Sequence, residues 1–384
     1  MSRASARSAL VIGAGFAGLA AADALAERGV EVTVLEALDR VGGRVWSQPL
    51  ADGSVVERGA EFVLPGYEVL SSFVRRLGLE LYEKGTLYGE RDPVGGPPTT
   101  TLEVREAAAG LVSADGGSVV DALARLVPAA GPRAAIESRV AVSTAYEPAD
   151  QPAAVLADGA AGFGPFPSHG VAGGNDLVAR RLAERLDVRL RAPVTRVVWG
   201  EGGVRTGELE ADVCVVAVPA HAAVALEFDP PLPAWKHDAL AAVRYGHAAK
   251  LFVPLAGPAP PSQTLAVPDR YWVWTQHGLP AASAFAGTAA ALERLRVADG
   301  PGAWADAVRR LRPDLPFADA EPLLATWPDG AYSARALSSP VDDDALARPV
   351  GPLAFAGEHT AGGWYALMEG ALRSGRRAAY DVAG

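Results

Sequence analysis

Over residues 9–35 the apolar positions change from a continuous run to helical spacing and then to a second strand. Residues 9–12 form an uninterrupted apolar run with the length and composition of a buried parallel strand. Over residues 19–26 apolar positions recur at helical spacing, and Gly29 ends this predicted helix. Residues 30–35 make a second predicted strand. The order of strand, helix and strand predicts a parallel βαβ unit.

The pattern predicts further elements along the chain. Residues 211–219 are nearly all apolar, which indicates a central strand buried on both faces. Residues 91–101 are rich in proline and glycine and should form a loop, while residues 103–157 have helical spacing. We expect further helices at 66–77 and 301–311. We expect further strands at 46–48, 54–57, 188–190, 192–194, 195–199, 248–255, 271–276 and 323–327. These elements predict an α/β fold, and a length of 384 residues favours two domains.

The turn between the first strand and its helix carries candidate chemistry. It reads Gly13-Ala14-Gly15-Phe16-Ala17-Gly18. Gly13 allows the tight turn, Gly15 lets the backbone approach a pyrophosphate, and Gly18 lets helix and strand pack closely. The helix N-terminus attracts phosphate charge, and Glu36 at the end of the second strand can accept hydrogen bonds from a ribose. The pattern predicts a dinucleotide site, and a glycine-rich turn without a ligand is the alternative.

Further motifs at both ends of the chain make it similar to one family. Gly42-Gly43-Arg44 follows the ribose acid, and Gly59-Ala60-Glu61-Phe62 comes next. The C-terminal part contains Phe355-Ala356-Gly357-Glu358-His359-Thr360 and then Trp364-Tyr365-Ala366-Leu367-Met368-Glu369-Gly370. In this order the motifs resemble those of the flavin-containing amine oxidase superfamily, which includes monoamine, polyamine and L-amino acid oxidases.

The resemblance implies a discontinuous Rossmann-like FAD-binding domain and a smaller α+β substrate domain with a mixed sheet. We place FAD-binding segments at 1–90, 171–228 and 349–384, and substrate segments at 91–170 and 229–348. The resemblance further implies FAD as the cofactor, held by Gly13, Gly15, Phe16, Ala17, Gly18, Glu36, Ala37, Gly43, Arg44, Gly59, Ala60, Glu61, Val194, Trp327, Gly357, Glu358, Ala366, Leu367 and Met368.

Three of these positions have specific implied roles. The family's acid at Glu358 caps the ribityl–pyrophosphate region, and backbone atoms at Val194 hold the adenine. The helix that begins at residues 366–371 should turn its N-terminus toward the pyrimidine end of the flavin ring, where it favours the anion formed on reduction. An ordinary helix-capping acid is the alternative for Glu358.

Lys250 lies in the middle of an apolar predicted strand. A lysine there is costly unless its amine reaches a partner or an enclosed water. In the family, a lysine on the matching strand holds a water against flavin N5. A lysine that reaches solvent from an edge strand is the alternative.

Aromatic residues suggest where an amine would approach the flavin. Tyr332 resembles one wall of the family's aromatic pair, while Leu367 stands where monoamine oxidases have the other wall. Trp364 or Tyr365 could replace that wall, so the candidate catalytic residues are Lys250, Tyr332, Trp364 and Tyr365. Ala331 occupies the place of the cysteine that binds flavin covalently in monoamine oxidases, which implies non-covalent FAD.

Tyr271, Trp272 and Trp274 form a dense aromatic cluster on one predicted strand. Because neighbouring residues of a strand alternate between faces, at least one of them should pack in the core. Those on the cavity face would suit an aryl or alkyl amine.

Net charge and cysteine content argue against several kinds of binding site. A formal net charge of −10 argues against nucleic-acid binding. The single cysteine, Cys214, excludes an internal disulfide and a multi-cysteine metal site, and its apolar run favours a packing role. We expect no metal. No targeting signal or apolar membrane anchor is visible, so we expect a cytoplasmic protein, monomeric or homodimeric.

The function that these features favour is oxidation of an amine to an imine by FAD, with O2 reduced to H2O2. The imine would hydrolyse to a carbonyl compound and an amine or ammonia. An L-amino acid oxidase is one alternative. No arginine directly follows the Gly59-Ala60 segment to clamp a carboxylate, but an arginine from elsewhere, such as Arg244, could take that role. A flavin desaturase and a catalytically silent flavoprotein are the others.

Overall fold

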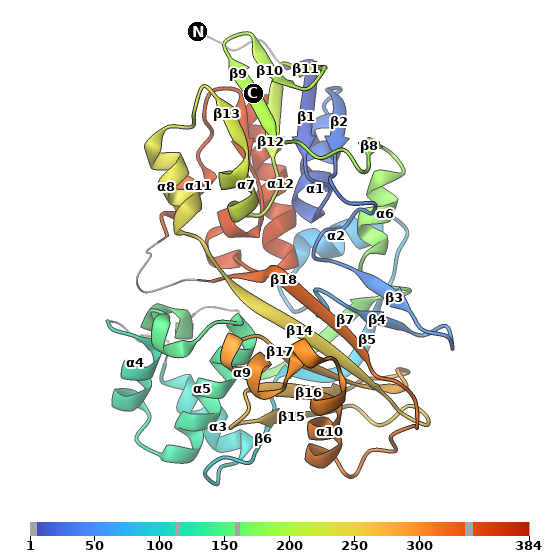
Figure 1. The fold of residues 1–384 in the computed structure, drawn as a ribbon, viewed down its shortest axis with the longest axis vertical. Coiled ribbons are helices and arrows are strands. Elements are labelled where there is room, and N and C mark those ends of the chain that lie inside the picture. Colours follow the sequence, from blue (N-terminus) through green and yellow to red (C-terminus); the bar gives the residue numbers. More distant parts are fainter. Residues whose placement is uncertain (1–5, 112–115, 158–161, 335–340, 384) are drawn as a thin grey trace.

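The computed structural model describes residues 6–111, 116–157, 162–334 and 341–383, with the backbone alone for 328–334. Figure 1 shows two layers of structure, one above the other, with both termini in the upper layer. The upper layer contains a parallel sheet with helices on both faces and a second, smaller sheet against one of them. The lower layer is a mixed sheet with helices on both faces. This arrangement confirms the predicted α/β fold class.

The parallel sheet holds the predicted βαβ unit at its centre. Its strands, in spatial order, are β19 (Leu353–Phe355), β12 (Val213–Val216), β1 (Ser8–Ile12), β2 (Glu31–Leu35) and β8 (Asp187–Arg189). Strand β12 pairs with β1 on one side and β19 on the other, so the prediction of a central strand is confirmed. Cys214 in β12 is buried, and burial raises the pKa of its thiol to about 12.

The two faces of this sheet have different coverings. Ala9 and Val11 pack under helices α1 (Phe16–Ala26), α2 (Glu68–Arg76), α6 (Leu177–Ala183) and α12 (Met368–Ala383). Leu10 and Ile12 point to the opposite face of the parallel sheet, which a small second sheet and three helices cover. The small sheet consists of β9 (Arg196–Gly200), β10 (Gly203–Thr206), β11 (Leu209–Ala211) and β13 (Glu227–Asp229), and the helices are α7 (Ala220–Ala225), α8 (Ala234–Ala242) and α11 (Asp343–Ala347). The alternation of buried residues along β1 follows the period of two of a strand.

The mixed sheet forms the core of the lower layer. Its strands, in order, are β18 (Leu323–Ala334), β14 (Arg244–Pro254), β17 (Ala281–Ala286), β16 (Tyr271–Thr275), β15 (Ser262–Ala266) and β6 (Asp92–Val94). One face packs on α3 (Thr101–Ala109), α4 (Val119–Leu126) and α5 (Ala130–Thr144). The other packs on α9 (Ala289–Arg294) and α10 (Gly302–Leu311).

Long strands connect the layers. Strands β14 and β18 run from beneath the parallel sheet into the mixed sheet (Figure 1). Two antiparallel pairs lie beside them, the hairpin of β3 (Ser47–Pro49) with β4 (Val55–Glu57), and the pair of β5 (Leu81–Gly89) with β7 (Gly164–Val171). Residues from both layers therefore meet where β14 passes β4 and β5.

Two predictions of local structure were wrong. Residues 91–101 are not only a loop, because β6 lies within them and pairs in parallel with β15. Pro93 is tolerated there because β6 is the last strand of its sheet and needs no hydrogen-bond donor on its outer side. Residues 192–194 are not a strand, because the pairing of β8 with β2 ends at Arg189 and Arg191 adopts φ +52°, which does not continue a strand.

Candidate functional site

The glycine turn after β1 forms an open cradle. Gly13 has φ +102°, and a Cβ there would lie 2.8 Å from the carbonyl oxygen of Ala217. A Cβ on Gly18 would lie 1.8 Å from the carbonyl oxygen of Gly13, so helix and turn touch as predicted. Gly15 has open space at its Cβ position, and as the N-cap of α1 it leaves the helix end without a side-chain cap. Phe16 and Ala17 form the buried first turn of α1. The bare helix end can therefore accept an anion.

Glu36 lies beside this cradle. Its carboxylate accepts hydrogen bonds from the backbone N–H of Ala14 (2.7 Å) and of Leu38 (2.9 Å). Each carboxylate oxygen keeps a further lone pair, so the acid is fixed in orientation and can still accept from a ribose. The backbone N–H of Ala192 donates to the carbonyl of Glu36, which brings the segment with Val194 next to the strand end. Ala37 follows Glu36 and is exposed.

Arg44 and Glu358 join the two ends of the chain. The guanidinium donates to both carboxylate oxygens, at 2.9 and 2.7 Å, across 314 residues of sequence. Burial opposes the charge of Glu358, but Arg44 and a hydrogen bond from His359 hold the pKa of this carboxyl well below its usual range. An acid engaged in this way is not an ordinary helix cap, and the short helix that Glu358 begins has no side-chain cap.

Other predicted positions converge on the same place. Gly43 lies close to Gly15, because a Cβ on Gly43 would be 3.4 Å from the Cα of Gly15. A Cβ on Gly59 would lie 1.9 Å from the carbonyl oxygen of Arg44, and Ala60 donates its N–H to the same carbonyl. Gly357 donates its N–H to Ser374 in α12. These segments thus form one continuous surface around the cradle.

Three of the predicted aromatic positions, Trp327, Trp364 and Tyr365, have described side chains. Trp364 packs edge-on against Tyr67 and under the guanidinium of Arg373, and Tyr365 is buried. Trp327 donates its indole N–H to the carbonyl of Arg58 (2.9 Å). The side chain of Tyr332 lies outside the part of the chain whose side chains the structure describes.

A cavity of about 730 Å³, including the part open to solvent, lies next to the start of α12. Ala366, with φ +63°, Leu367 and Met368 line it, and the helix itself begins at Met368 rather than at residue 366. Trp364 and Tyr365 are not among the described lining residues. The remaining described lining residues are Ala60, Glu61, Phe62, Leu64, Tyr67, Tyr88, Arg91, Val142, Ser143, Lys250, Trp272, Trp274 and Phe285.

Strand β16 divides its aromatic residues as predicted. The hydroxyl of Tyr271 donates to the carbonyl of Ala307 in α10, so this residue belongs to the core. Trp272 and Trp274 lie on the cavity face, stacked with ring centroids 4.2 Å apart. Phe62 packs against both, which gives the cavity a continuous aromatic wall.

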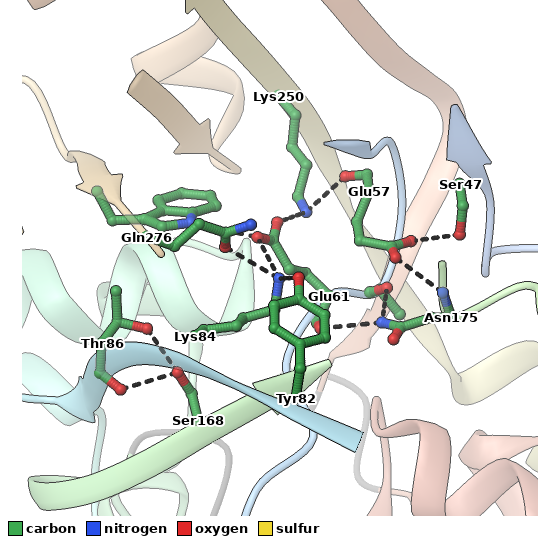
Figure 2. A network of polar contacts seen from close by, with 12 residues as sticks. Ser47, Glu57, Glu61, Tyr82, Lys84, Thr86, Ser168, Asn175, Lys250 and Gln276 are labelled. Carbon is green, nitrogen blue, oxygen red and sulfur yellow. Dashed lines mark hydrogen bonds and ion pairs between the residues drawn. The ribbon is translucent and has the colours of Figure 1, made fainter. Parts of the chain in front are cut away.

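The polar end of the cavity is a buried network of charges (Figure 2). Lys250 is 4% exposed, and its amine donates to Glu61 at 2.6 Å and to the carbonyl of Glu57 at 2.8 Å. The alternative of a lysine that reaches solvent is therefore wrong. Lys84, from β5, donates to Glu61 (3.3 Å), to Gln276 (2.9 Å) and to the hydroxyl of Tyr82 (3.2 Å). Glu61, predicted as a cofactor contact, is thus the acid that two buried lysines share.

The pKa values in this network move in opposite directions. Burial lowers the pKa of Lys250, and Glu61 opposes that shift. Burial disfavours the charge on Glu61, but Lys250 and Lys84 hold the pKa of its carboxyl below the usual value. Glu57 accepts from the hydroxyl of Ser47 and the N–H of Asn175, yet burial raises its pKa to about 7. Groups with such separated pKa values are typical of functional sites.

Sequence reasoning missed three of the charged residues: Glu57, Lys84 and Arg91. Glu57 ends a short predicted strand, where nothing in the sequence marks its carboxylate as buried. Lys84 lies in a strand of mixed polarity that carries no clear pattern, so nothing in the sequence marks it as buried. Arg91 lies in the segment that we expected to be a loop. No group of His, Cys, Asp and Glu placed to bind a metal occurs among the described residues. None of the helices in the described ranges combines the length and apolarity needed to cross a bilayer.

Comparison with known proteins identifies relatives along most of the chain. The model of a family described as "Flavin containing amine oxidoreductase" matches residues 16–96 and 154–383. A putative flavin-containing monoamine oxidase, AofH, of Mycobacterium tuberculosis is 27% identical over 97% of this chain and 96% of its own length. A putrescine oxidase of Kocuria rosea is 38% identical, but over only 38% of this chain and 28% of that protein.

Solved structures share the whole fold. A cyclohexylamine oxidase from Brevibacterium oxydans superposes with a TM-score of 0.81 over 98% of this chain and 99% of that one, at 22% identity. A putrescine oxidase solved with putrescine bound gives a TM-score of 0.80 over 98% of both chains, at 25% identity.

Proposed function

The chain belongs to the flavin-containing amine oxidoreductase family, and from this premise we propose that it oxidises an amine at a carbon–nitrogen bond and passes the electrons to O2. The products would be an imine, which hydrolyses to a carbonyl compound and ammonia or an amine, and H2O2. The observation that carries the proposal is the cavity, which joins a buried lysine–carboxylate network to an aromatic wall beside the start of α12.

The residues present fit FAD, which is the cofactor of this family. The open Cβ position of Gly15 and the uncapped start of α1 leave room and charge for a pyrophosphate. Glu36 keeps acceptor capacity for a ribose. The Arg44–Glu358 pair and the backbone at residues 366–368 lie farther along the same surface, where they would hold the ribityl chain and the flavin ring.

Bound FAD supplies the acceptor for the hydride equivalent that leaves the carbon next to nitrogen. This chemistry needs the neutral amine. The aromatic wall disfavours the charged ammonium form of a substrate, because burial in apolar surroundings destabilises charge. Lys250 provides an oriented N–H donor at the polar end, where it would hold a water. The protein thus orients and desolvates the substrate.

A peroxide-release screen tests the proposal. The FAD-loaded protein would be incubated with monoamines, polyamines and amino acids, and anaerobic bleaching of the flavin would be followed in parallel. We expect at least one amine class to bleach the flavin and to release H2O2 in air. A flavoprotein that no amine bleaches would instead be the silent flavoprotein.

We further propose that FAD is bound without a covalent link, because Ala331 replaces the attachment cysteine and Cys214 is buried. Acid or heat precipitation should release all of the flavin to the supernatant. Yellow colour that stays with the precipitated protein would contradict this.

A further inference from the structure

Arg91 is a buried arginine on the wall of the cavity. It directly precedes β6, is 5% exposed, and lines the cavity together with Tyr88 and Trp272. Its Nε and Nη1 atoms are buried without a hydrogen-bond partner, and among the described residues it makes no ion pair. A buried guanidinium without an acceptor is costly, so this position indicates a ligand group that the protein itself does not provide.

The acids closest to Arg91 in sequence are engaged elsewhere. Glu90 accepts from Arg105 at 2.8 Å, and Asp92 accepts from the hydroxyl of Thr101 at 2.8 Å. Among the described lining residues the remaining acid is Glu61, which Lys84 and Lys250 already share. The cavity therefore has an excess of positive charge, and that excess lies at Arg91.

Aromatic contacts fix where Arg91 lies in the cavity. Its guanidinium carbon is 3.7 Å from the ring centroid of Trp272, on which Trp274 stacks at 4.2 Å. A guanidinium and an indole cannot share one face of a ring at these distances, so Trp272 lies between Arg91 and Trp274. Trp274 in turn donates to Glu61 and lies 5.7 Å from the amine of Lys250. Arg91 thus contacts the Trp272 end of the stacked pair, whereas Lys250 lies by the Trp274 end.

A second unpaired donor lies beside Arg91. The indole nitrogen of Trp272 is buried and has no hydrogen-bond partner among the described residues. The other arginine in this region differs, because Arg139 donates to Ser143 and to the carbonyls of Tyr88 and Gly162. Arg91 and Trp272 therefore form a donor pair without an acceptor.

We propose that Arg91 binds a carboxylate on the substrate, at the end of the cavity remote from Lys250. The amine half of this inference rests on the proposed function. An α-amino acid would not fit, because its carboxylate is one bond from the carbon that reacts, whereas Arg91 contacts Trp272 and Lys250 lies by Trp274, the other ring of the stacked pair. The substrate class is an amine with a carboxylate several bonds from its nitrogen, such as an ω-amino carboxylate. Arg244 has no such role, because it is exposed and donates to the carbonyl of Ala241.

The test compares matched substrates on the FAD-loaded protein. Initial rates would be measured for 4-aminobutanoate, 6-aminohexanoate and 8-aminooctanoate and for propylamine, pentylamine and heptylamine. We expect the parent to prefer an aminocarboxylate over the plain amine of similar length. Arg91→Gln should lower kcat/KM for the aminocarboxylate by about tenfold or more, mainly through KM, because a bidentate charged contact is lost. For the plain amine it should change kcat/KM by less than about twofold.

Two further variants control the experiment. Arg91→Lys keeps a positive charge but not the planar fork, so it should retain part of the preference. Arg105→Gln removes an equal charge from the Glu90 pair outside the cavity, and it should keep the full preference. If Arg91→Gln does not fold, the carboxylate site is tested by the ratio of kcat/KM for aminocarboxylate and plain amine, measured in the parent and in Arg91→Lys. A parent that oxidises the plain amine as efficiently as the aminocarboxylate overturns the inference.

A binding measurement separates this inference from the proposed function. Hexanoate carries no amine, and its binding to the FAD-loaded protein can be followed by tryptophan fluorescence. Saturable binding that Arg91→Gln weakens, in a protein that oxidises no amine, would support the carboxylate site and refute the amine oxidase. Equal hexanoate binding by parent and variant would overturn the carboxylate site whatever the activity.

Discussion

The cradle after β1 and the cavity under α12 are built in different ways. The cradle uses backbone atoms of one short stretch, and its charged member, Glu36, is held by the N–H groups of Ala14 and Leu38 nearby in sequence or space. The cavity uses side chains that β5, β14, β16 and the segment after β4 bring together. A site of the first kind depends on local sequence, whereas a site of the second kind depends on the packing of distant elements. Mutations in the cradle should therefore change the affinity for FAD, whereas mutations in the cavity should change the stability of the protein or the rate of the reaction.

Removing the shared acid of the cavity should have the largest effect. Glu61→Gln leaves Lys84 and Lys250 buried without a carboxylate, and loss of one partner from a buried ion pair costs about 3–5 kcal/mol. Urea unfolding of the FAD-loaded protein measures the change. Adding Lys84→Met should recover part of the loss, because one unpaired charge disappears. A variant as stable as the parent would show that the network contributes nothing to folding.

The second prediction concerns the pH dependence of stability. The pKa of Glu57 is raised to about 7 in the folded protein, above its unfolded value. The folded state therefore binds the proton of Glu57 more tightly than the unfolded state does. The stabilisation that this proton gives the folded state is fully present below about pH 4.5 and is lost as pH rises through about 7. Each unit by which the pKa is raised corresponds to about 1.4 kcal/mol.

Glu57→Gln removes this titration while keeping an amide oxygen for the N–H of Asn175, and its NH2 group can donate to the hydroxyl oxygen of Ser47. The stability of the parent should fall relative to the variant between about pH 5 and pH 8, measured by urea unfolding across that range. Parallel pH profiles would show that Glu57 does not titrate in this window.

A change in the cradle should act on FAD instead. Glu36→Ala removes a charged acceptor for the ribose, a contact worth roughly 1.5–3 kcal/mol. We expect weaker FAD retention by titration of the apoprotein, with little change in the rate of the fully loaded enzyme. FAD affinity within about twofold of the parent, less than 0.5 kcal/mol, would place the ribose elsewhere.

The prediction with the smallest expected change concerns Lys250 and the activation free energy of flavin reoxidation. Lys250→Met keeps the volume of the stem, and Glu61 retains Lys84 and Trp274 as partners, so fold and FAD content should survive. Anaerobic reduction followed by mixing with O2 should show flavin reoxidation slowed by about tenfold or more, or about 1.4 kcal/mol. Lys84→Met is the matched control, because Lys84 contacts the same acid but is not among the described residues that line the cavity. It should change the rate by less than about threefold, or about 0.65 kcal/mol. Equal rates for parent and Lys250→Met would leave this lysine a purely structural role.

The sequence by itself determined the βαβ unit, the glycine turn, the ribose acid and the burial of β12. These features depend on contacts within about 30 residues or on the composition of a single strand, so periodicity and local geometry are sufficient to predict them. It also predicted a partner or an enclosed water for Lys250, with solvent as the alternative, because a charge among the apolar neighbours on this strand is costly.

Only the tertiary structure decided which residue that partner is. Lys84 and Arg91 lie in segments without a clear pattern, and their burial follows from the pairing of β5 with β7 and of β6 with β15. Arg91 meets Trp272 across about 180 residues because that pairing fixes the position of β6 beside the aromatic wall. A strand pattern shows that alternate residues share a face, but the neighbouring elements determine what that face contacts, and here they determined the charge of the cavity.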